Sequence, residues 1–290
     1  MAQTVESGYE RITSVRKTQQ ITSAMRMVAA AKLRRAQDAI IAARPYAAQM
    51  FATLEEIGRR ALEPEHPLLE QRTERRSLEV VVVTSDRGLC GAFNANVLKR
   101  AEVLLAERGP RFESVSLGLV GRKAVDYFRR RRASQIACTW TDLGTVDYRH
   151  AVAIAEHVSS RFISREVDEV VFVYNEFVSA LSQVPREVTA LPLVPGRVEG
   201  DAEEAIPFQI EPDAQTVYAV LIPNALEFNI YRVLLESQAG EHAARMAAME
   251  SATRNTEELI RSLTLQFNRA RQAAITKELV EIVTGAQALE

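Results

Sequence analysis

The sequence has few cysteines, few aromatic residues and no long apolar run. Its two cysteines, Cys90 and Cys138, are too few for a disulfide framework, so we expect each to behave as a small buried apolar residue. No run of about 18 apolar residues occurs, and we therefore expect no membrane-spanning helix. The opening residues, MAQTVESGYE, lack the apolar core of a signal peptide. The histidines are scattered and none lies at metal-ligand spacing from other ligand residues, which predicts no metal site.

Helix-breaking residues are scarce in the two terminal segments. Between Gly8 and Pro45 there is neither glycine nor proline, and after Pro223 the only such residues are Gly240 and Gly285. Alanine, the best helix former, is abundant in both segments. The composition therefore predicts one long helix at each end of the chain, with a mild kink at Pro45.

Apolar residues recur every three or four positions along both segments, as they do in helices that pack against a partner helix. A helix over 12–57 would be about 68 Å long and one over 225–284 about 90 Å, too long for elements of a compact domain. We expect the two to pair as an antiparallel coiled coil. The first stripe comprises Ile12, Val15, Gln19, Thr22, Arg26, Ala29, Leu33, Ala36, Ile40, Ala43, Ala47, Met50, Leu54 and Ile57; the second comprises Leu235, Ala239, His242, Met246, Met249, Thr253, Thr256, Ile260, Leu263, Phe267, Ala270 and Ala274.

Strand and helix patterns alternate in the middle of the chain, which predicts a mostly parallel sheet covered by helices. The fold class is thus α/β, a Rossmann-like insert between two coiled-coil helices. We divide the chain into residues 1–60, 75–222 and 223–290. The expected strands are 78–84, 114–120, 136–140 and 167–174, the expected helices are 94–108, 122–132 and 148–165, and 185–223 is expected to be a loop with one hairpin-like extension.

The first helix is strongly basic. Residues 11–44 hold eight Lys and Arg side chains against one acid, Asp38, although the whole chain has a net charge of −2. Three interpretations are open: a solvated helix face, a nucleic-acid contact, or a shaft inside a sleeve with acidic walls. The apolar stripe on the same helix and the lack of aromatic residues before Tyr46, apart from Tyr9, argue against nucleic acid.

Gly88 and Gly91 follow the first expected strand, but this turn lacks the lysine of a phosphate-binding loop. Close chain approach or a positive φ explains these glycines better than nucleotide binding. No glycine-flanked serine and no zinc-type histidine pair occurs either. We therefore predict no catalytic residue, no cofactor and no metal.

Four runs of the sequence resemble the gamma subunits of rotary ATP synthases, in the right order and over nearly the whole chain. Residues 11–33 read RITSVRKTQQITSAMRMVAAAKL and are similar to the N-terminal helix of that family. The central turn of the family is matched at 84–94 by TSDRGLCGAFN. The middle is matched by FVSALSQ at 177–183 and EPD at 211–213, and the C-terminal signature by ITKE at 275–278, Glu281 and GAQA at 285–288.

The resemblance implies a rotor shaft without catalytic activity of its own. The terminal helices would lie inside a hexamer of alpha and beta subunits, and the insert would contact the epsilon subunit and the membrane c-ring. One copy would serve each complex, in proton transport and ATP synthesis. The complex would lie at the cytoplasmic face of a bacterial inner membrane, although a mature mitochondrial form stays open as an origin. The regulatory cysteine pair of chloroplast members is missing.

The resemblance also implies which residues meet those partners. Glu211 would lie near the rotor ring. Thr276 has a second interpretation, as an ordinary helical threonine that bonds back to a backbone carbonyl. The residues implied to contact the beta subunit are Met25, Arg26, Arg245, Arg271, Gln272, Thr276 and Glu278.

Two other functions compete with the shaft. A dinucleotide-binding enzyme with long oligomerising helices would need a glycine fingerprint after a strand, which is absent. A coiled-coil protein with an α/β insert, binding nucleic acid or serving as a scaffold, is the remaining alternative. Nucleic-acid binding would fall steeply with added salt.

Overall fold

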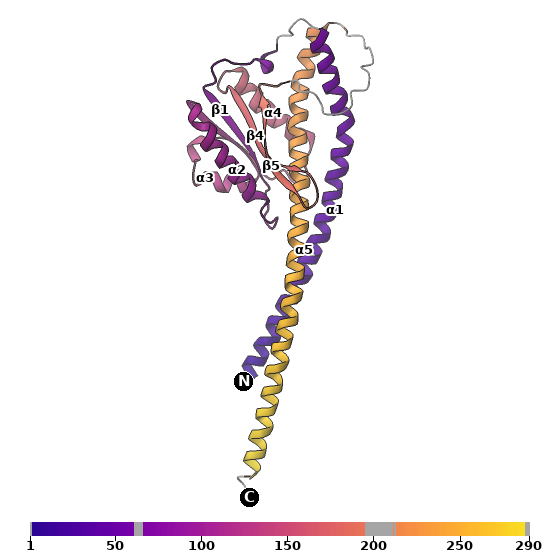
Figure 1. The fold of residues 1–290 in the computed structure, drawn as a ribbon, viewed down its shortest axis with the longest axis vertical. Helices are drawn as coiled ribbons and strands as arrows, with labels where there is room; N and C mark the ends of the chain where they lie inside the picture. Colours follow the sequence, from indigo (N-terminus) through magenta and orange to yellow (C-terminus); the bar gives the residue numbers. More distant parts are fainter. Residues whose placement is uncertain (1, 61–65, 195–210, 212, 288–290) are drawn as a thin grey trace. The chain divides into compact units, whose positions relative to one another are not determined.

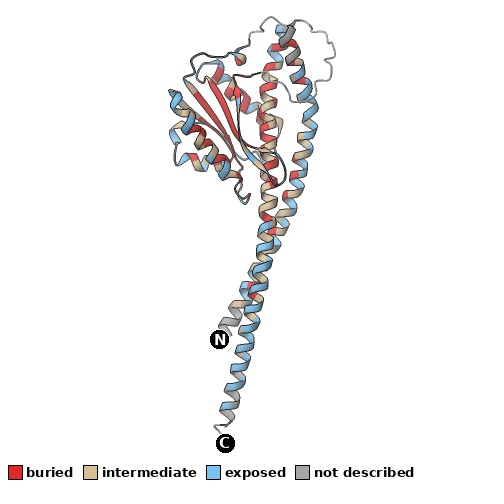
Figure 2. Cartoon of the chain, in the orientation of Figure 1, coloured by how far each residue is buried: buried red, intermediate tan, exposed pale blue. Residues whose placement is uncertain are grey.

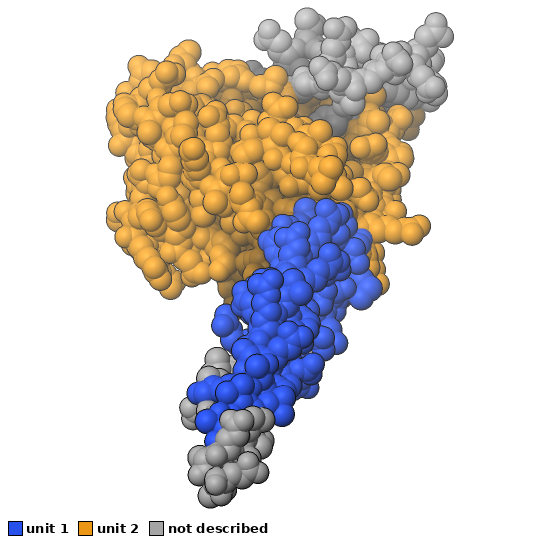
Figure 3. Space-filling view, turned by 60° about the horizontal axis from the view of Figure 1, so that its bottom comes forward, with its two compact units in different colours: residues 1–30, 245–290 blue, residues 31–244 orange. Residues whose placement is uncertain are grey.

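The computed structural model describes residues 2–60, 66–194, 211 and 213–287. The chain forms two compact units: unit 1 comprises 1–30 and 245–290, and unit 2 comprises 31–244 (Figure 3). Two long helices, α1 (Ala2–Arg60) and α5 (Ala214–Gln287), each contribute to both units (Figure 1). The prediction of long terminal helices is confirmed.

The helix α5 begins earlier than expected. We placed its start at Ala225, after Pro223, but the helix begins at Ala214 and contains that proline. Asp213 explains the start, because its carboxylate accepts hydrogen bonds from the backbone N–H of Thr216 at 2.8 Å and from the Thr216 hydroxyl at 2.8 Å. A carboxylate before the first turn satisfies N–H groups that no helical carbonyl can reach.

The strands form one mixed sheet in unit 2. They are β1 (Ser77–Val83), β2 (Ser114–Val120), β3 (Ile136–Trp140), β4 (Glu169–Phe177) and β5 (Gln183–Leu191). Their order is β3-β2-β1-β4-β5; the first four are parallel and β5 is antiparallel to β4. The predicted α/β insert is therefore confirmed.

Helices cover both faces of this sheet. The connecting helices are α2 (Phe93–Arg108), α3 (Arg122–Arg129) and α4 (Tyr148–Ile163). Alternate residues of β1 belong to two separate buried clusters, one with α2 and α3 and the other with α4, α1 and α5. The central strands β1 and β4 are accordingly among the most buried parts of the chain (Figure 2). Burial on both faces explains why β1 ends in four consecutive valines, Val80 to Val83.

The segment 185–223 differs from the expected loop. Its first part belongs to β5 and its last part to α5, while 195–210 and 212, including the acidic run 199–204, lie outside the described residues. Pro185 is tolerated within β5 because that strand lies at the edge of the sheet, where one side of the backbone has no ladder partner. The hairpin of β4 and β5 connects through a turn at 178–182, which matches the expected extension only in part.

The turn after β1 adopts positive φ at Gly91 (57°) and also at Leu89 (63°). The amide side chain of Asn94 closes this turn, because its Oδ1 accepts the backbone N–H of Ser85 at 3.0 Å. Cys90 is buried there, as expected, whereas Cys138 on β3 is only half-buried. The positive-φ explanation therefore holds for Gly91.

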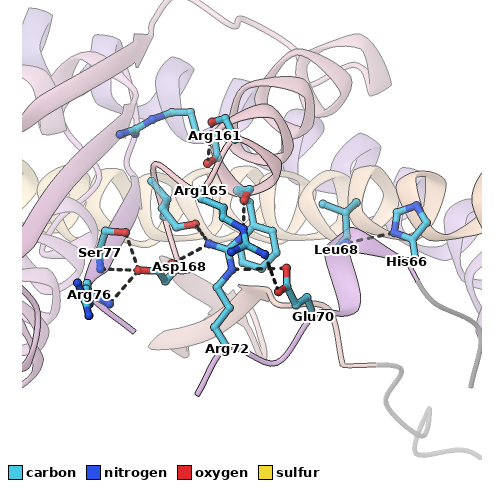
Figure 4. Close-up of polar contacts among 12 residues, drawn as sticks. His66, Leu68, Glu70, Arg72, Arg76, Ser77, Arg161, Arg165 and Asp168 are labelled. Atoms are coloured by element: carbon cyan, nitrogen blue, oxygen red, sulfur yellow. Dashed lines mark hydrogen bonds and ion pairs between the residues drawn. The ribbon is translucent and has the colours of Figure 1, made fainter. Parts of the chain in front are cut away.

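Polar contacts fasten the segment before β1 to the edge where the parallel strands begin (Figure 4). The Asp168 carboxylate accepts from the Arg72 guanidinium at 2.7 Å, from the Arg76 and Ser77 backbone N–H groups at 2.8 and 2.9 Å, and from the Ser77 hydroxyl at 2.9 Å. Arg72 also donates to the carbonyl of Phe162 at 2.6 Å and lies over that ring. Burial acts to raise the pKa of Asp168, but these donors outweigh it and lower the pKa to about 2.

We predict that Gly121→Ala will strongly destabilise the fold. Gly121 has a φ of +87°, and a Cβ there would lie 2.3 Å from the carbonyl oxygen of Thr84. The Thr84 backbone directly follows β1 and cannot move away from the added Cβ. We therefore expect the unfolding free energy to fall by about 2 kcal/mol or more, measured by urea denaturation. Gly144→Ala is the matched control: its φ is +63° but nothing lies within 4 Å, so only about 1 kcal/mol should be lost. If both variants lost the same unfolding free energy, the backbone at residue 121 would not lie as close to the Thr84 carbonyl as the structure shows.

We predict that Asp168→Asn will destabilise unit 2 at neutral pH by about 1–3 kcal/mol, because it removes a charged acceptor shared by several donors. The folded-state pKa of about 2 lies below the ordinary value of 3.8, so the carboxylate stabilises the fold above about pH 4. This contribution is lost as the pH falls toward 2. Urea titrations of both proteins should therefore give a difference that shrinks between pH 4 and pH 2; a pH-independent difference would contradict the assignment.

Candidate partner-binding surface on the paired helices

Unit 1 consists of the first part of α1 and the last part of α5, packed in opposite directions. The Thr22 and Thr253 hydroxyl oxygens lie 2.9 Å apart, and the Arg26 guanidinium donates to the Glu250 carboxylate at 2.6 Å. Nearer the N-terminus, Gly8 lies against Phe267, whose ring would be 3.2 Å from an added Cβ. Positions rising along α1 thus meet positions falling along α5. The predicted antiparallel pairing is confirmed.

The seam of unit 1 follows the predicted apolar stripes but encloses a thin core. Every described stripe residue of both helices is buried or half-buried. Few are fully shielded, however, and small or polar side chains interrupt the large ones. Among the described residues of unit 1, the buried side chains are Ile12, Thr22, Ala29, Met249 and Leu263.

Nine large apolar side chains are exposed on the described part of unit 1. Met27, for example, is 60% exposed although it is flanked by stripe residues. Scattered exposed apolar residues are normal, but a series of them along a two-helix seam indicates a surface that another protein covers. The series comprises Tyr9, Ile21, Met27, Val28, Leu259, Leu265, Ile275, Leu279 and Val280.

The polar contacts in the seam are local as well as interhelical. The Thr22 hydroxyl lies 3.0 Å from the carbonyl of Gln19, and the Thr253 hydroxyl lies 2.8 Å from that of Met249. A hydroxyl has one proton, so the threonine that donates across the seam gives up the bond to its own helix, while the threonine that accepts keeps it. Such a polar contact in an apolar seam favours one register of the two helices, at a cost in stability.

Arg26 and Glu250 form an ion pair beside this contact, with side chains 41% and 36% exposed. The hydrogen bond from Arg26 lowers the pKa of Glu250, so the carboxylate is ionised at neutral pH. An ion pair this exposed is screened by water and salt, and its stabilising effect is small. Glu250 was not among the predicted site residues. The antiparallel register that pairs Thr22 with Thr253 could have located it.

The structure divides the predicted beta-contact residues into two groups. Met25 and Arg245 are half-buried, and they lie near the Arg26–Glu250 pair in the same stretch of the seam. Arg245 makes interactions of its own within the chain. The second group, at 271–278, lies about 39 Å further along α5, counted from residue 245 to residue 271 at the helical rise. One partner contact therefore cannot engage both groups at a single point.

The second group is exposed. Arg271, Gln272 and Thr276 all face solvent, and the Thr276 hydroxyl donates to the backbone carbonyl of Gln272 at 2.9 Å. This bond is the one expected of an ordinary helical threonine. The Thr276 oxygen and the Gln272 amide remain accessible as polar groups. The side chain of Glu278 lies outside the described residues.

Glu211, the residue expected near a rotor ring, belongs to unit 2 and is exposed. It precedes α5 and its cap, Asp213. Among the described residues, no helix is apolar enough over a sufficient length to cross a membrane. The same described residues contain no cluster of ligand side chains suited to a metal ion.

The chain is similar to known proteins over nearly its full length. A family model described as ATP synthase matches residues 5–289. An ATP synthase gamma chain from Anaeromyxobacter sp. (strain Fw109-5) is 51% identical over 284 residues, covering 97% of both chains. Another from Chlorobium phaeobacteroides (strain BS1) is 48% identical over 285 residues, covering 97% of this chain and 96% of that protein.

Chains of similar fold also occur in solved structures of ATP synthases. The central stalk and c-ring structure of the Tetrahymena thermophila mitochondrial ATP synthase contains a chain with 25% identity and a TM-score of 0.61, matched over 80% of this chain and 99% of that one. A chain in the OSCP/F1/c-ring structure of the Euglena gracilis mitochondrial ATP synthase has a TM-score of 0.68 at 21% identity, matched over 100% and 95%. At that identity the second likeness shows the fold alone.

We predict that Thr22 and Thr253 are energetically coupled by about 0.5–1 kcal/mol. Each single change to valine should destabilise the helix pair, whereas the double variant should lose less than the sum, because no hydroxyl is left facing an apolar group. Amide hydrogen exchange over residues 20–30 and 245–255 reports the local opening free energy of each variant. Additive effects across the four proteins of the cycle would show that the two hydroxyls do not meet in solution.

Proposed function

The chain belongs to the ATP synthase gamma family, and from this membership we propose how its surfaces meet the other subunits. It is the central rotor stalk of an F-type ATP synthase, a non-catalytic subunit of a larger complex. Its division into segments 1–60, 75–222 and 223–290 is part of the same proposal.

Unit 1 is the part enclosed by a hexamer of alpha and beta subunits. The observation that carries this is the series of exposed apolar side chains on a helix pair whose own core is thin. Such a surface is costly in water and is stabilised by a surrounding sleeve. The basic side chains of α1 add an attraction to acidic walls that is long-ranged and weakly directional. A rotating shaft requires such a weakly directional attraction, because closely interlocked side chains would hold the shaft at one rotation angle.

The two groups of predicted residues serve two levels of that sleeve. Met25, Arg26 and Arg245 meet the acidic lever of a beta subunit, and the group at 271–278, with Gln272, Thr276 and Glu278, meets a beta loop further along. Their separation of about 39 Å along α5 supports two distinct contacts. Arg26 is half-buried in its pair with Glu250, so it can exchange this carboxylate for one on a passing beta subunit.

Unit 2 provides the contact with the epsilon subunit and the c-ring, with Glu211 close to the ring. One copy of the chain serves each complex. The complex is attached to the cytoplasmic face of a bacterial inner membrane through its partners.

The test is co-expression with alpha, beta and epsilon subunits, scored for a stable ATPase complex that contains one copy of this chain. In the complete synthase, with its membrane sector, we predict that Gln272→Leu combined with Thr276→Val lowers ATP-driven proton pumping at least twofold. The polar groups that meet the beta loop are removed, each worth about 1 kcal/mol. Quenching of a pH-sensitive dye in inverted vesicles, together with the rate of ATP hydrolysis, measures the coupling.

The matched control is Gln266→Leu with Thr264→Val, which makes the same chemical changes about two to three turns earlier on α5. Thr264 also bonds back to its own helix, through the Ile260 carbonyl at 2.7 Å. The control should assemble and pump normally. Normal pumping by the Gln272/Thr276 variant would remove these two residues from the beta contact, and failure of the wild-type chain to assemble would refute the proposed function itself.

A further inference from the structure

Four consecutive arginines, residues 129–132, stand where α3 ends. Arg129, Arg130 and Arg131 are exposed, whereas Arg132 is half-buried and pairs with Glu102 at 3.0 Å. Within the described part of the chain, no carboxylate pairs with Arg129 or Arg130. The run therefore carries positive charge that the described residues do not neutralise.

A fifth arginine adds to this charge. Arg111 ends the short helix η2 (Gly109–Arg111), is exposed, and has no carboxylate partner among the described residues. Arg131 is held by a neighbour of its own helix: its guanidinium lies 4.0 Å from the centre of the Tyr127 ring and donates to the Tyr127 carbonyl at 3.2 Å. We call Arg111, Arg129, Arg130 and Arg131 the arginine patch.

The patch lies at the edge of the sheet where the parallel strands begin. Arg111 precedes β2 and the run 129–132 precedes β3, and these two strands are parallel neighbours. The segments that lead into neighbouring parallel strands lie at the same edge. Exposed acids at this edge are partly engaged elsewhere, since Glu74 and Glu113 both lie against Arg76, at 2.6 and 3.8 Å.

The same edge of unit 2 holds the end of α1 and the beginning of α5. The Tyr218 hydroxyl lies 3.4 Å from the carbonyl of Leu54, and both residues pack in one cluster with Phe162, at the end of α4, and Val170, near the start of β4. In Figure 1, β1 likewise begins at the end of unit 2 where α1 ends and α5 starts. Glu211 stands just before α5, at this end.

We propose that the arginine patch is a docking surface for the anionic phospholipid headgroups of the membrane beside the rotor ring. The inference rests on the proposed function, which directs the Glu211 end of unit 2 toward that ring. Arginines near an anionic leaflet are attracted within about one Debye length, roughly 8 Å at physiological salt. A planar guanidinium group can also donate two parallel hydrogen bonds to two oxygens of one phosphate.

Rotation favours this partner over a stationary protein. A fluid bilayer is laterally uniform, so attraction to it has no preferred angle around the rotor axis. An acidic patch on a stationary subunit would instead attract the arginines at one rotor angle and hold the rotor there once in every turn. The four arginines of the patch lie at one edge and have no acidic partner within the described chain. They can therefore bind the phosphate groups of a membrane surface at any rotor angle.

The experiment uses the complex assembled with alpha, beta and epsilon subunits, without the ring. Flotation with phosphatidylcholine vesicles, with and without about one third phosphatidylglycerol, measures binding at low and at physiological salt. We expect binding to the anionic vesicles only, weakened by salt, and lowered about tenfold by Arg129→Gln with Arg130→Gln.

Arg149→Gln with Arg186→Gln is the matched control. It removes the same charge from exposed arginines of unit 2, one in the first turn of α4 and one on β5, and should leave vesicle binding unchanged.

Equal loss in both variants, undiminished binding by the Arg129/Arg130 variant, or equal binding to neutral vesicles would each overturn the proposal. Loss of the epsilon subunit from the Arg129/Arg130 variant with vesicle binding intact would assign the patch to an acidic protein instead. Failure to form the complex is seen before any vesicle is added, so it counts against the proposed function alone.

Discussion

The pairing of α1 with α5 is the contact on which the rest of the structure depends. Each helix carries one mostly apolar stripe along much of its length, and neither stripe is covered by its own helix. In unit 1 the two stripes cover one another through few and small contacts, around the Thr22–Thr253 pair. In unit 2 the same helices also cover one face of the sheet, so their apolar residues join a large core. One pattern in the sequence thus serves two kinds of packing.

The elements of the insert are joined to one another by polar as well as apolar contacts. Arg72 and Asp168 fasten the chain between α1 and β1 to the end of α4 and the beginning of β4. The Glu79 carboxylate, fully buried on β1, pairs with Arg161 of α4 at 2.6 Å. Breaking such a pair leaves a buried charge uncompensated, which is strongly destabilising. These contacts make unit 2 suited to transmit force without deforming.

The chemistry of unit 1 suits a moving contact. Most of its charged side chains are exposed, its ion pairs are exposed enough to be weak, and its apolar groups are spread along the helices rather than gathered in one pocket. A strong and local interaction would favour one orientation, while several weak ones allow successive orientations of similar energy. A non-catalytic subunit that transmits rotation needs this property, and it explains why the chain offers many small contacts where an enzyme would have one built site.

The sequence alone determined what depends on local pattern. The strands 114–120 and 136–140 were predicted to the residue, and the stripe residues of both helices are buried or half-buried, because periodicity and strand propensity act between near neighbours. Only the tertiary structure decided that β5 adds to the sheet edge, that Glu250 meets Arg26, and that Asp168 collects the donors around Arg72. Those contacts join residues far apart in the chain, and no local pattern encodes which distant partner a polar side chain will find.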